Sequence, residues 1–422
     1  MNTGSMLAKT RLDVIVIGGG AAGMMAALQA AWAGAQVVLL EKNEKLGKKI
    51  YITGKGRCNV TNACDMEDFF KQVPRNSKFL NAAVRQFGYE DVTSLLEMLG
   101  TPTKVERGNR VFPESDKASD VTRAFARGMK DAGVQVELNT GAKSVLKEEG
   151  GFAVALERGG TLHAKTVIVA TGGLSYPSTG CTGDGYAFAK ENGHTITPLC
   201  GSLVGLTIDE KWPKLLMGLS LKNVRVSAQM GKKKIYDELG EMLFTHFGVS
   251  GPLIIELSSH MPENFADVAV TLDMKPGLTP EQVDLRLQRE FQENVRKQLS
   301  SVLVGLMPAR MGPVFAELCG ISPEQPINQI TREQRMVIAK NLKALPLHVT
   351  GTRPIEEAIV TRGGIEVKEV SPSTMMSKLA PGLFFAGEVL DVDAHTGGFN
   401  LQIAFSTGAL AGRSAAAYCT EE

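Results

Sequence analysis

The sequence predicts an α/β protein in which one parallel-sheet domain is built from both ends of the chain around an inserted domain. Residues 12–42 read as a complete strand–helix–strand unit, and residues 166–173 read as a second buried strand that ends in Ala-Thr-Gly-Gly. Residues 382–416 add another buried strand and a helix of small residues. We expect the parallel-sheet domain at residues 10–195 and 351–416, and the insert at residues 196–350.

The first strand–helix–strand unit carries a nucleotide-binding fingerprint. The β-branched run Asp13–Ile17 stops at Gly18-x-Gly20-x-x-Gly23, and a strong helix-forming stretch follows. The first glycine permits a tight turn, the second lets the backbone approach a pyrophosphate, and the third lets the helix pack on the strand. Free amides at the helix N-terminus favour the phosphates. Glu41 ends the second strand, where a carboxylate accepts ribose hydroxyls, so the pattern favours FAD or NAD over NADP.

Composition excludes several other classes of protein. The 422 residues include 46 basic and 45 acidic side chains, so the total charge does not indicate polyanion binding. Residues 14–40 carry no charge, but three glycines interrupt them early, and a basic leader with a cleavage pattern is missing; we therefore expect neither a membrane span nor a signal peptide. Six scattered cysteines without paired spacing indicate a cytoplasmic protein with reduced thiols and no metal site.

The loop at residues 45–62 is dense in groups that bind a phosphorylated cofactor. Glycines for close backbone approach, cations, and small hydroxyl or amide side chains alternate along it. They are Gly47, Gly54 and Gly56, then Lys48, Lys49 and Arg57, then Asn59, Thr61 and Asn62. Cys58 has two interpretations, a small packed residue, which we favour, or a thiol beside the cofactor ring.

Two further segments of the first part are candidate cofactor contacts. The loop at residues 140–145 follows an alternating strand and is either an adenine contact or a surface turn. Asp184 begins a helix after a Thr-Gly dipeptide, and we expect its carboxylate to cap that helix. This second glycine cluster is not followed by another strand–helix–strand unit, so we do not read it as a second nucleotide-binding fold.

The insert reads as a β-rich part at residues 199–273 and a helical part at residues 279–345, with residues 346–354 as a linker back. His246 lies between a threonine and a glycine-marked turn, as a structural histidine or an active-site residue. The cations of the helical part form a solvated face or, alternatively, a nucleic-acid contact. After the insert, the final helix would point its positive end at the cofactor ring, as in flavoproteins.

Together these blocks resemble the BaiN/YhiN-type NAD(P)/FAD-dependent oxidoreductases, a bacterial family with aminoacetone oxidase-like flavoproteins. The resemblance covers nearly all of residues 12–412. Two positions depart from the family pattern: Lys55 replaces a usual glycine, and Arg362 adds a charge beside two glycines. The motifs are Gly18 to Gly23, Gly54-Lys-Gly-Arg-Cys-Asn59, Arg110-Val-Phe-Pro113, Ala170-Thr-Gly-Gly173, Leu243-Phe-Thr-His246 with Ser250-Gly-Pro252, and Gly387-Glu388 with Gly397-Gly-Phe-Asn400.

The resemblance implies a discontinuous, glutathione-reductase-like Rossmann domain that binds FAD, with the insert over the flavin. His246 is our choice of proton donor, with Cys58 behind it. The expected cofactor-binding residues are Gly18, Gly20, Ala22, Gly23, Glu41, Lys42, Lys49, Gly56, Arg57, Cys58, Asn59, Thr61, Ala142, Ala170, Thr171, Gly172, Asp184, Gly387, Glu388, Gly398, Asn400 and Leu401.

Activities in this family differ, so the resemblance implies the cofactor more closely than the reaction. Our lead hypothesis is an FAD-dependent oxidoreductase in which NADH or NADPH binds transiently and hydride passes through flavin N5 to an activated carbon–carbon double bond of a small molecule. One alternative is an amine oxidase that produces hydrogen peroxide. Another is a flavoenzyme that forms dihydrouridine in ribosomal RNA. The sequence leaves the oligomeric state open.

Overall fold

The computed structural model describes residues 11–262 and 264–420 and divides the chain into two compact units. The first unit contains the residues up to 202 and those from 355 onward, and the second unit contains residues 203–354. Sequence analysis put these boundaries at 196 and 350. In the described part of the chain, every helix is too short or too polar to span a lipid bilayer.

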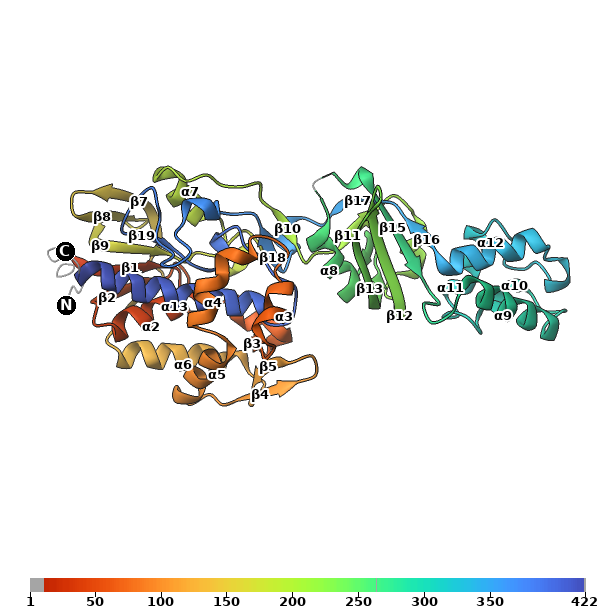
Figure 1. The fold of residues 1–422 in the computed structure, drawn as a ribbon, viewed down its shortest axis with the longest axis horizontal. Coiled ribbons are helices and arrows are strands. Elements are labelled where there is room, and N and C mark those ends of the chain that lie inside the picture. The colour runs from red at the N-terminus through yellow and green to blue at the C-terminus, as the bar shows by residue number, and fades with distance from the viewer. Residues whose placement is uncertain (1–10, 263, 421–422) are drawn as a thin grey trace. The chain divides into compact units, whose positions relative to one another are not determined.

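The first unit is built on a parallel sheet whose strands come from both parts of the chain (Figure 1). One edge of strand β9 pairs with the parallel strand β1. The other edge pairs with the antiparallel β8 near the start of β9 and with the parallel β19 near its end. The strands are β1 (Leu12–Ile17), β2 (Val37–Leu40), β6 (Gln135–Glu137), β7 (Ala142–Glu148), β8 (Gly151–Leu156), β9 (Thr161–Val169) and β19 (Leu383–Phe385). This sheet confirms the predicted α/β class and joins the C-terminal segment to the N-terminal one.

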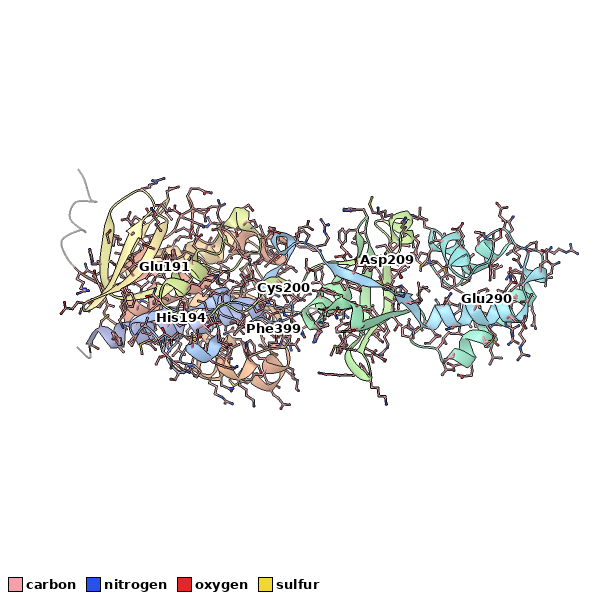
Figure 2. The ribbon with its side chains drawn as sticks, turned by 90° about the horizontal axis from the view of Figure 1, so that it is seen from above. Glu191, His194, Cys200, Asp209, Glu290 and Phe399 are labelled. Carbon is pink, nitrogen blue, oxygen red and sulfur yellow. The ribbon has the colours of Figure 1, made fainter. Side chains whose placement is uncertain are left out.

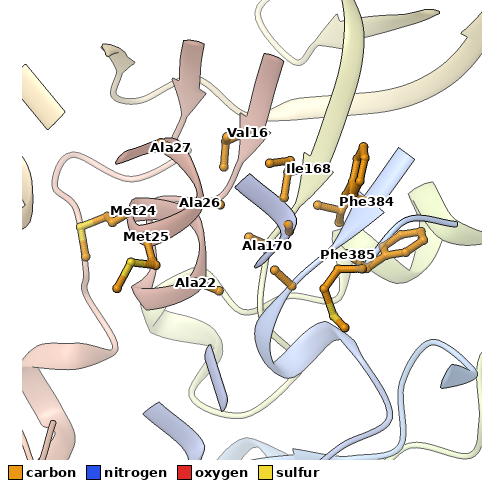
Figure 3. Close-up of a cluster of buried hydrophobic side chains, with 14 of the residues drawn as sticks. Val16, Ala22, Met24, Met25, Ala26, Ala27, Ile168, Ala170, Phe384 and Phe385 are labelled. Atoms are coloured by element: carbon orange, nitrogen blue, oxygen red, sulfur yellow. The ribbon is translucent and has the colours of Figure 1, made fainter. Parts of the chain in front are cut away.

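Two helices of small residues cover this sheet in close contact. Helix α13 (Phe399–Thr420) packs against α2 (Ala21–Trp32). A Cβ atom on Gly408 or Gly412 would lie 2.4 or 2.3 Å from the carbonyl oxygen of Ala22 or Ala26, so the backbones touch where glycine leaves room. Figure 3 shows these alanines beside Val16, Ile168 and Phe384 of the sheet. The pairing makes the helices parallel, and α13 begins about two turns before the level at which α2 starts.

Smaller elements complete the first unit. They are α3 (Met66–Lys71), α4 (Asn81–Gln86), α5 (Tyr89–Met98), α6 (Ala118–Asp131) and α7 (Asp184–Glu191), with a sheet of β3 (Thr61–Asn62), β5 (Arg110–Pro113) and β4 (Thr103–Glu106) and a pair of β10 (Cys200–Ser202) and β18 (Val360–Arg362). His194, labelled in Figure 2, connects the N-terminal and C-terminal parts of the chain that form the first unit. Its Nε2 lies 2.7 Å from Ser377 Oγ, its Nδ1 lies 3.3 Å from Glu369 Oε2, and burial lowers its pKa.

The second unit is an antiparallel sheet followed by a helical part. The order is β16-β15-β12-β13-β14-β11-β17. The strands are β11 (Leu206–Ile208), β12 (Ser220–Met230), β13 (Lys233–Phe244), β14 (Gly248–Ser250), β15 (Val268–Asp273), β16 (Leu345–Leu347) and β17 (Val349–Thr352), and the helices are α8 (Pro252–His260), α9 (Pro280–Glu293), α10 (Leu299–Leu303), α11 (Met311–Leu318) and α12 (Arg332–Lys343). Thr279 and Thr331 begin α9 and α12 with capping boxes.

The prediction of a linker at residues 346–354 is wrong. This segment contributes β16 and β17 to opposite edges of the sheet. Leu345, Leu347 and Val349 are buried, whereas Pro346 and His348 between them are exposed. An alternation of only five residues, interrupted by proline, was too short to indicate strands in the sequence.

Candidate active site

A cleft opens along the carboxyl ends of the parallel strands in the first unit. It encloses about 1270 Å³ of empty space, which includes the solvent at its mouth. Its walls contain the residues that follow β1, β2, β9 and β19, together with the first turns of α2 and α13. Ligands of open parallel sheets bind at this edge, where strand ends and helix N-termini meet.

The glycine-rich turn between β1 and α2 forms the middle of the cleft. A Cβ on Gly18, whose φ is +105°, would lie 2.5 Å from the carbonyl oxygen of Ala170, and a Cβ on Gly23 would lie 1.8 Å from that of Gly18. A Cβ on Gly20 would meet nothing within 4 Å. Gly20 lines the cleft and begins α2 without a side-chain cap. The first amides of this helix are therefore available to an anion such as a pyrophosphate.

One end of the cleft carries carboxylates and lysines. The buried Glu41 accepts hydrogen bonds from the amides of Gly19 (2.7 Å) and Asn43 (2.8 Å), which hold its carboxylate at the end of β2. Lys42 pairs with Asp184 at 2.6 Å. The expectation that Asp184 caps α7 is wrong, because Gly183 occupies the N-cap and Asp184 is already inside the helix, where its side chain turns to Lys42.

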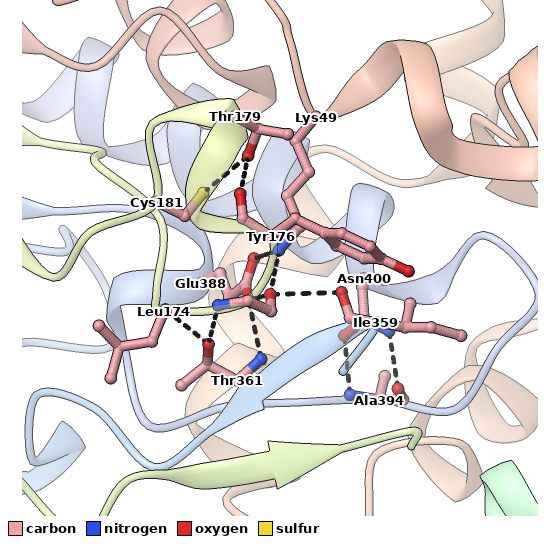
Figure 4. Close-up of polar contacts among 11 residues, drawn as sticks. Lys49, Leu174, Tyr176, Thr179, Cys181, Ile359, Thr361, Glu388, Ala394 and Asn400 are labelled. Carbon is pink, nitrogen blue, oxygen red and sulfur yellow. Dashed lines mark hydrogen bonds and ion pairs between the residues drawn. The ribbon is translucent and has the colours of Figure 1, made fainter. Parts of the chain in front are cut away.

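Another part of the cleft holds a connected group of polar side chains (Figure 4). Lys49 Nζ lies 2.6 Å from Glu388 Oε2, and both residues line the cleft. Glu388 Oε1 accepts hydrogen bonds from the Thr361 amide (2.8 Å) and from Ser175 Oγ (2.9 Å). Ser175 is also the partner of Lys49 Nζ. A charged pair whose carboxylate accepts from two further donors keeps a defined geometry.

Sequence analysis missed several residues of this end. Ser175 and Thr361 were not proposed, and neither were the lining residues Ile359, Val360 and Cys181. Ser175 follows the Thr-Gly-Gly turn closely, and Thr361 begins a Thr-Arg-Gly-Gly turn, so glycine turns after strands were the available signal. Burial raises the pKa of the Cys181 thiol, which therefore stays protonated.

The structure brings most of the predicted cofactor residues to the cleft and leaves the others outside its wall. The residues that line it are Gly18, Gly20, Ala22, Glu41, Lys42, Lys49, Ala142, Ala170, Thr171, Gly172, Asp184, Gly387, Glu388, Asn400 and Leu401. The residues that do not line it are Gly23, Gly56, Arg57, Cys58, Asn59, Thr61 and Gly398.

Packing explains the positions of the residues outside the wall. The guanidinium of Arg57 pairs with Glu106 and Asp116 beside β4 and β5, which raises its pKa. Cys58 is fully buried, and burial raises the pKa of its thiol to about 12. A Cβ on Gly398 would lie 2.3 Å from the carbonyl oxygen of Thr61, so these two residues seat the start of α13. Arg57 and Cys58 are thus engaged in ion pairs and in the core rather than in the cleft wall.

His246, the predicted proton donor, lies in the second unit. It follows β13 in the turn before β14, where its side chain is exposed and its ring contacts the ring of Phe247 edge-on at 5.1 Å. The contacts of this turn assign no chemical role to the imidazole, and a role in catalysis stays a prediction.

The chemistry of the cleft fits an FAD molecule. Free helix amides and the lysines in the cleft wall suit phosphates, and Glu41 suits ribose hydroxyls. Thr171 Oγ1 is buried in the cleft wall and has no hydrogen-bond partner among the described residues. Apolar side chains such as Ile50, Val360 and Ile403 line the remaining surface and suit a flat ring.

Fold, cleft and relatives together define a Rossmann-fold flavoprotein of the oxidoreductase class. The chain belongs to the family described as HI0933-like protein Rossmann domain, whose model matches residues 12–414. It is 33% identical over 407 residues to the 3-dehydro-bile acid delta(4,6)-reductase of Clostridium scindens, covering 95% of this chain and 98% of that one. It is 31% identical to the ribosomal RNA dihydrouridine synthase of Escherichia coli, covering 94% of this chain and 96% of that one.

Among solved structures, the chain is similar to the FrdA subunit of E. coli quinol fumarate reductase. The TM-score is 0.50 at 15% identity, and the match covers 97% of this chain and 71% of that chain. At this identity the similarity concerns the fold alone.

Proposed function

We propose that this protein is an FAD-dependent reductase that transfers hydride from NADH or NADPH to an activated carbon–carbon double bond of a small molecule. The observation that carries the proposal is the cleft, which offers an anion-binding turn in its middle and a separate polar group, Lys49 with Glu388, at one end. FAD, when bound, accepts hydride and donates it at its N5 atom. The described residues contain one nucleotide-binding strand–helix–strand unit, so the nicotinamide would share the substrate position.

The relatives support this reaction class. One of them is named a delta(4,6)-reductase, and another is named for dihydrouridine, a base that contains two hydrogens more than uridine. Both names denote the addition of two hydrogens to a double bond, although the substrates differ in size and charge. Relatives that share a cofactor-binding unit but differ in their substrate sites are expected to catalyse the same reaction on different substrates.

The side chains of this chain would bind and orient the reactants. The turn at Gly20 and the start of α2 would bind the pyrophosphate, and Glu41 would bind the ribose of the adenosine. Lys49 and Glu388 would hold the opposite part of the cofactor, because Ser175 and Thr361 fix the carboxylate in place. The parallel α13 directs its positive N-terminus to the same end, where it favours negative charge.

The test begins with an absorption spectrum of the purified protein and continues with anaerobic titration by each nicotinamide. Bleaching of the flavin bands by NADH or NADPH is expected, and no bleaching by either would exclude the proposed reductant. Exposure to air with a small amine then tests the oxidase alternative, which requires hydrogen peroxide that forms only when the amine is present.

A ribosomal RNA substrate is the second candidate, and the identity to the E. coli dihydrouridine synthase favours it. Deletion of the gene for this protein would then remove a dihydrouridine from ribosomal RNA, as measured by mass spectrometry of RNA digests. An unchanged dihydrouridine content in the deletion strain would exclude the ribosomal RNA substrate and retain the proposed reaction on a small molecule.

A further inference from the structure

We propose that Tyr176 is the catalytic acid of the reduction and that its hydroxyl donates the proton. The inference rests on the proposed function, because a proton is required only if a double bond receives hydride. Tyr176 lies next to Ser175, whose hydroxyl binds both Lys49 and Glu388 of the cleft wall. Tyr176 does not line the cleft itself, but Ile359 and Asn400 do, and Figure 4 shows the Tyr176 ring on their side.

The backbone of Tyr176 is strained. Its φ of +52° and ψ of 63° lie in the left-handed region, where the Cβ atom crowds the backbone. Five of the ten described non-glycine residues with positive φ are asparagine or aspartate, which tolerate it, and Tyr176 is the aromatic one among the ten. It also precedes Pro177, and residues before proline favour extended backbone. Strain of this kind persists where surrounding contacts enforce it and is concentrated at active sites.

Specific contacts enforce this conformation. The Tyr176 amide donates a hydrogen bond to the Glu356 carbonyl at 3.2 Å. Its carbonyl accepts two, from the Thr179 amide at 2.8 Å and from Thr179 Oγ1 at 2.7 Å. The following short helix therefore closes on Tyr176 from one side, and the segment before β18 holds it from the other.

The Tyr176 hydroxyl differs from its neighbours in being free to meet a ligand. The side chain is partly exposed, and no hydrogen bond of its hydroxyl is found among the residues that the structure describes. In Figure 4 its ring extends away from the Glu388 carboxylate, on the side of Asn400 and Ile359. Ser175 and Thr361 are bonded within the group, and Cys181 is buried. Compared with these three side chains, Tyr176 therefore presents an accessible hydroxyl.

The step balances as an overall addition of two hydrogens. Hydride from the reduced cofactor forms a bond to one carbon of the double bond, and the phenolic proton forms a bond to the other carbon as the π bond breaks. The cofactor is oxidised by two electrons and the substrate is reduced. The phenolate then takes a proton from water, and NADH or NADPH restores the reduced cofactor. General acid catalysis of this type contributes roughly 10²–10⁴-fold.

The experiment separates the two halves of the reaction in three variants. Tyr176→Phe removes the hydroxyl and keeps the ring, Tyr176→Gly removes the strain, and Tyr89→Phe on α5 is the matched control. Each protein is reduced anaerobically with dithionite and mixed with 4-androstene-3,17-dione, a conjugated enone. Return of the flavin absorbance measures transfer to the double bond. Bleaching by NADH or NADPH and thermal unfolding are measured separately.

We expect Tyr176→Phe to slow reoxidation by the enone at least about 100-fold and to leave bleaching within about twofold of wild type. Tyr176→Gly should show the same loss with a higher melting temperature, because glycine adopts this left-handed backbone without strain. Tyr89→Phe should match wild type in both half-reactions.

Three results would overturn the proposal. They are reoxidation of Tyr176→Phe within threefold of wild type, a lower melting temperature for Tyr176→Gly, and no enone-dependent reoxidation of the dithionite-reduced wild type. A loss of reoxidation in His246→Gln, with none in Tyr176→Phe, would assign the acid to His246. Failure of the nicotinamides to bleach the wild-type flavin would contradict only the proposed reductant, because dithionite supplies the electrons here.

Discussion

Residues 18–23 and residues 54–59 are both rich in glycine, and both contain backbone in the left-handed region. In the first segment, Gly18 and Gly20 line the cleft, and the close approaches are made to the carbonyl oxygens of Ala170, which follows β9, and of Gly18 in the turn itself. In the second segment no residue lines the cleft, and Arg57 and Cys58 are engaged in ion pairs and in the core. A segment rich in glycines and hydrogen-bond donors thus indicates only a tight turn. A glycine-rich turn that joins the end of a strand to the start of a helix indicates a turn that binds a ligand.

The largest effect is expected for Gly23→Ala in the first segment. Its new Cβ would lie 1.8 Å from the Gly18 carbonyl oxygen, so the turn must open, at a cost of about 3 kcal/mol in the free energy of unfolding. Gly20→Ala is the matched control. Its new Cβ would meet no protein atom within 4 Å, and the residue lines the cleft, so the change affects the cleft and not the packing.

Gly20→Ala should keep the stability within about 1 kcal/mol and weaken FAD binding about tenfold or more. Urea unfolding and the ratio of flavin to protein absorbance measure the two effects. Equal stabilities of the two variants would contradict the assigned roles of these glycines.

Lys55→Gly in the second segment should stabilise the protein. Lys55 has a φ of +59°, and relief of roughly 1–2 kcal/mol of strain is partly offset by the greater freedom of glycine in the unfolded chain, about 0.4–1 kcal/mol. A net gain of about 0.5 kcal/mol is expected in urea unfolding, with Lys55→Ala as the control that retains the Cβ. A loss of stability in Lys55→Gly would show that the lysine side chain has a role that offsets its strain.

Arg57→Met tests whether the second segment contacts the cofactor. Because the guanidinium pairs with Glu106 and Asp116 outside the cleft wall, we expect FAD affinity to stay within about twofold of wild type. Release of FAD on dilution, followed by its fluorescence, measures the affinity. A loss as large as that of Gly20→Ala would place Arg57 at the cofactor.

The smallest effect is expected at Cys58. With its pKa near 12, about one part in 10⁴ of this thiol is ionised at pH 8, so iodoacetamide should leave it unmodified in the native protein. Alkylation should become complete in urea, as measured by mass spectrometry of peptides. Rapid modification of native Cys58 would mean that the thiol reaches solvent and would support its predicted catalytic role.

Local patterns explain why much of the first unit could be predicted. The β-branched run of β1, the glycine turn and the helix-forming residues of α2 are neighbours in sequence, and their contacts are also local. Glu41 follows at the end of the next strand. Each of these positions depends on the geometry of one strand–helix–strand unit, which is the same in many proteins.

Long-range pairing explains what could not be predicted. Arg57 and Cys58 are positioned by the approach of β5, about 50 residues later, and Ser175 meets Thr361 across 186 residues. Leu345 to Thr352 became strands because β15 and β11 offered free edges to a short apolar alternation. In each case the partner was far away in sequence, and the local pattern was compatible with several structures.

By itself, the sequence determined that this chain contains a Rossmann-like nucleotide-binding unit assembled from its two ends, since strand and helix periodicity and the glycine turn are written locally. Only the tertiary structure decided which donors reach the cleft, because a side chain that reads as a ligand is equally able to satisfy a buried partner. It also showed the strained Tyr176, whose conformation depends on contacts with Glu356 and Thr179 rather than on its own preference.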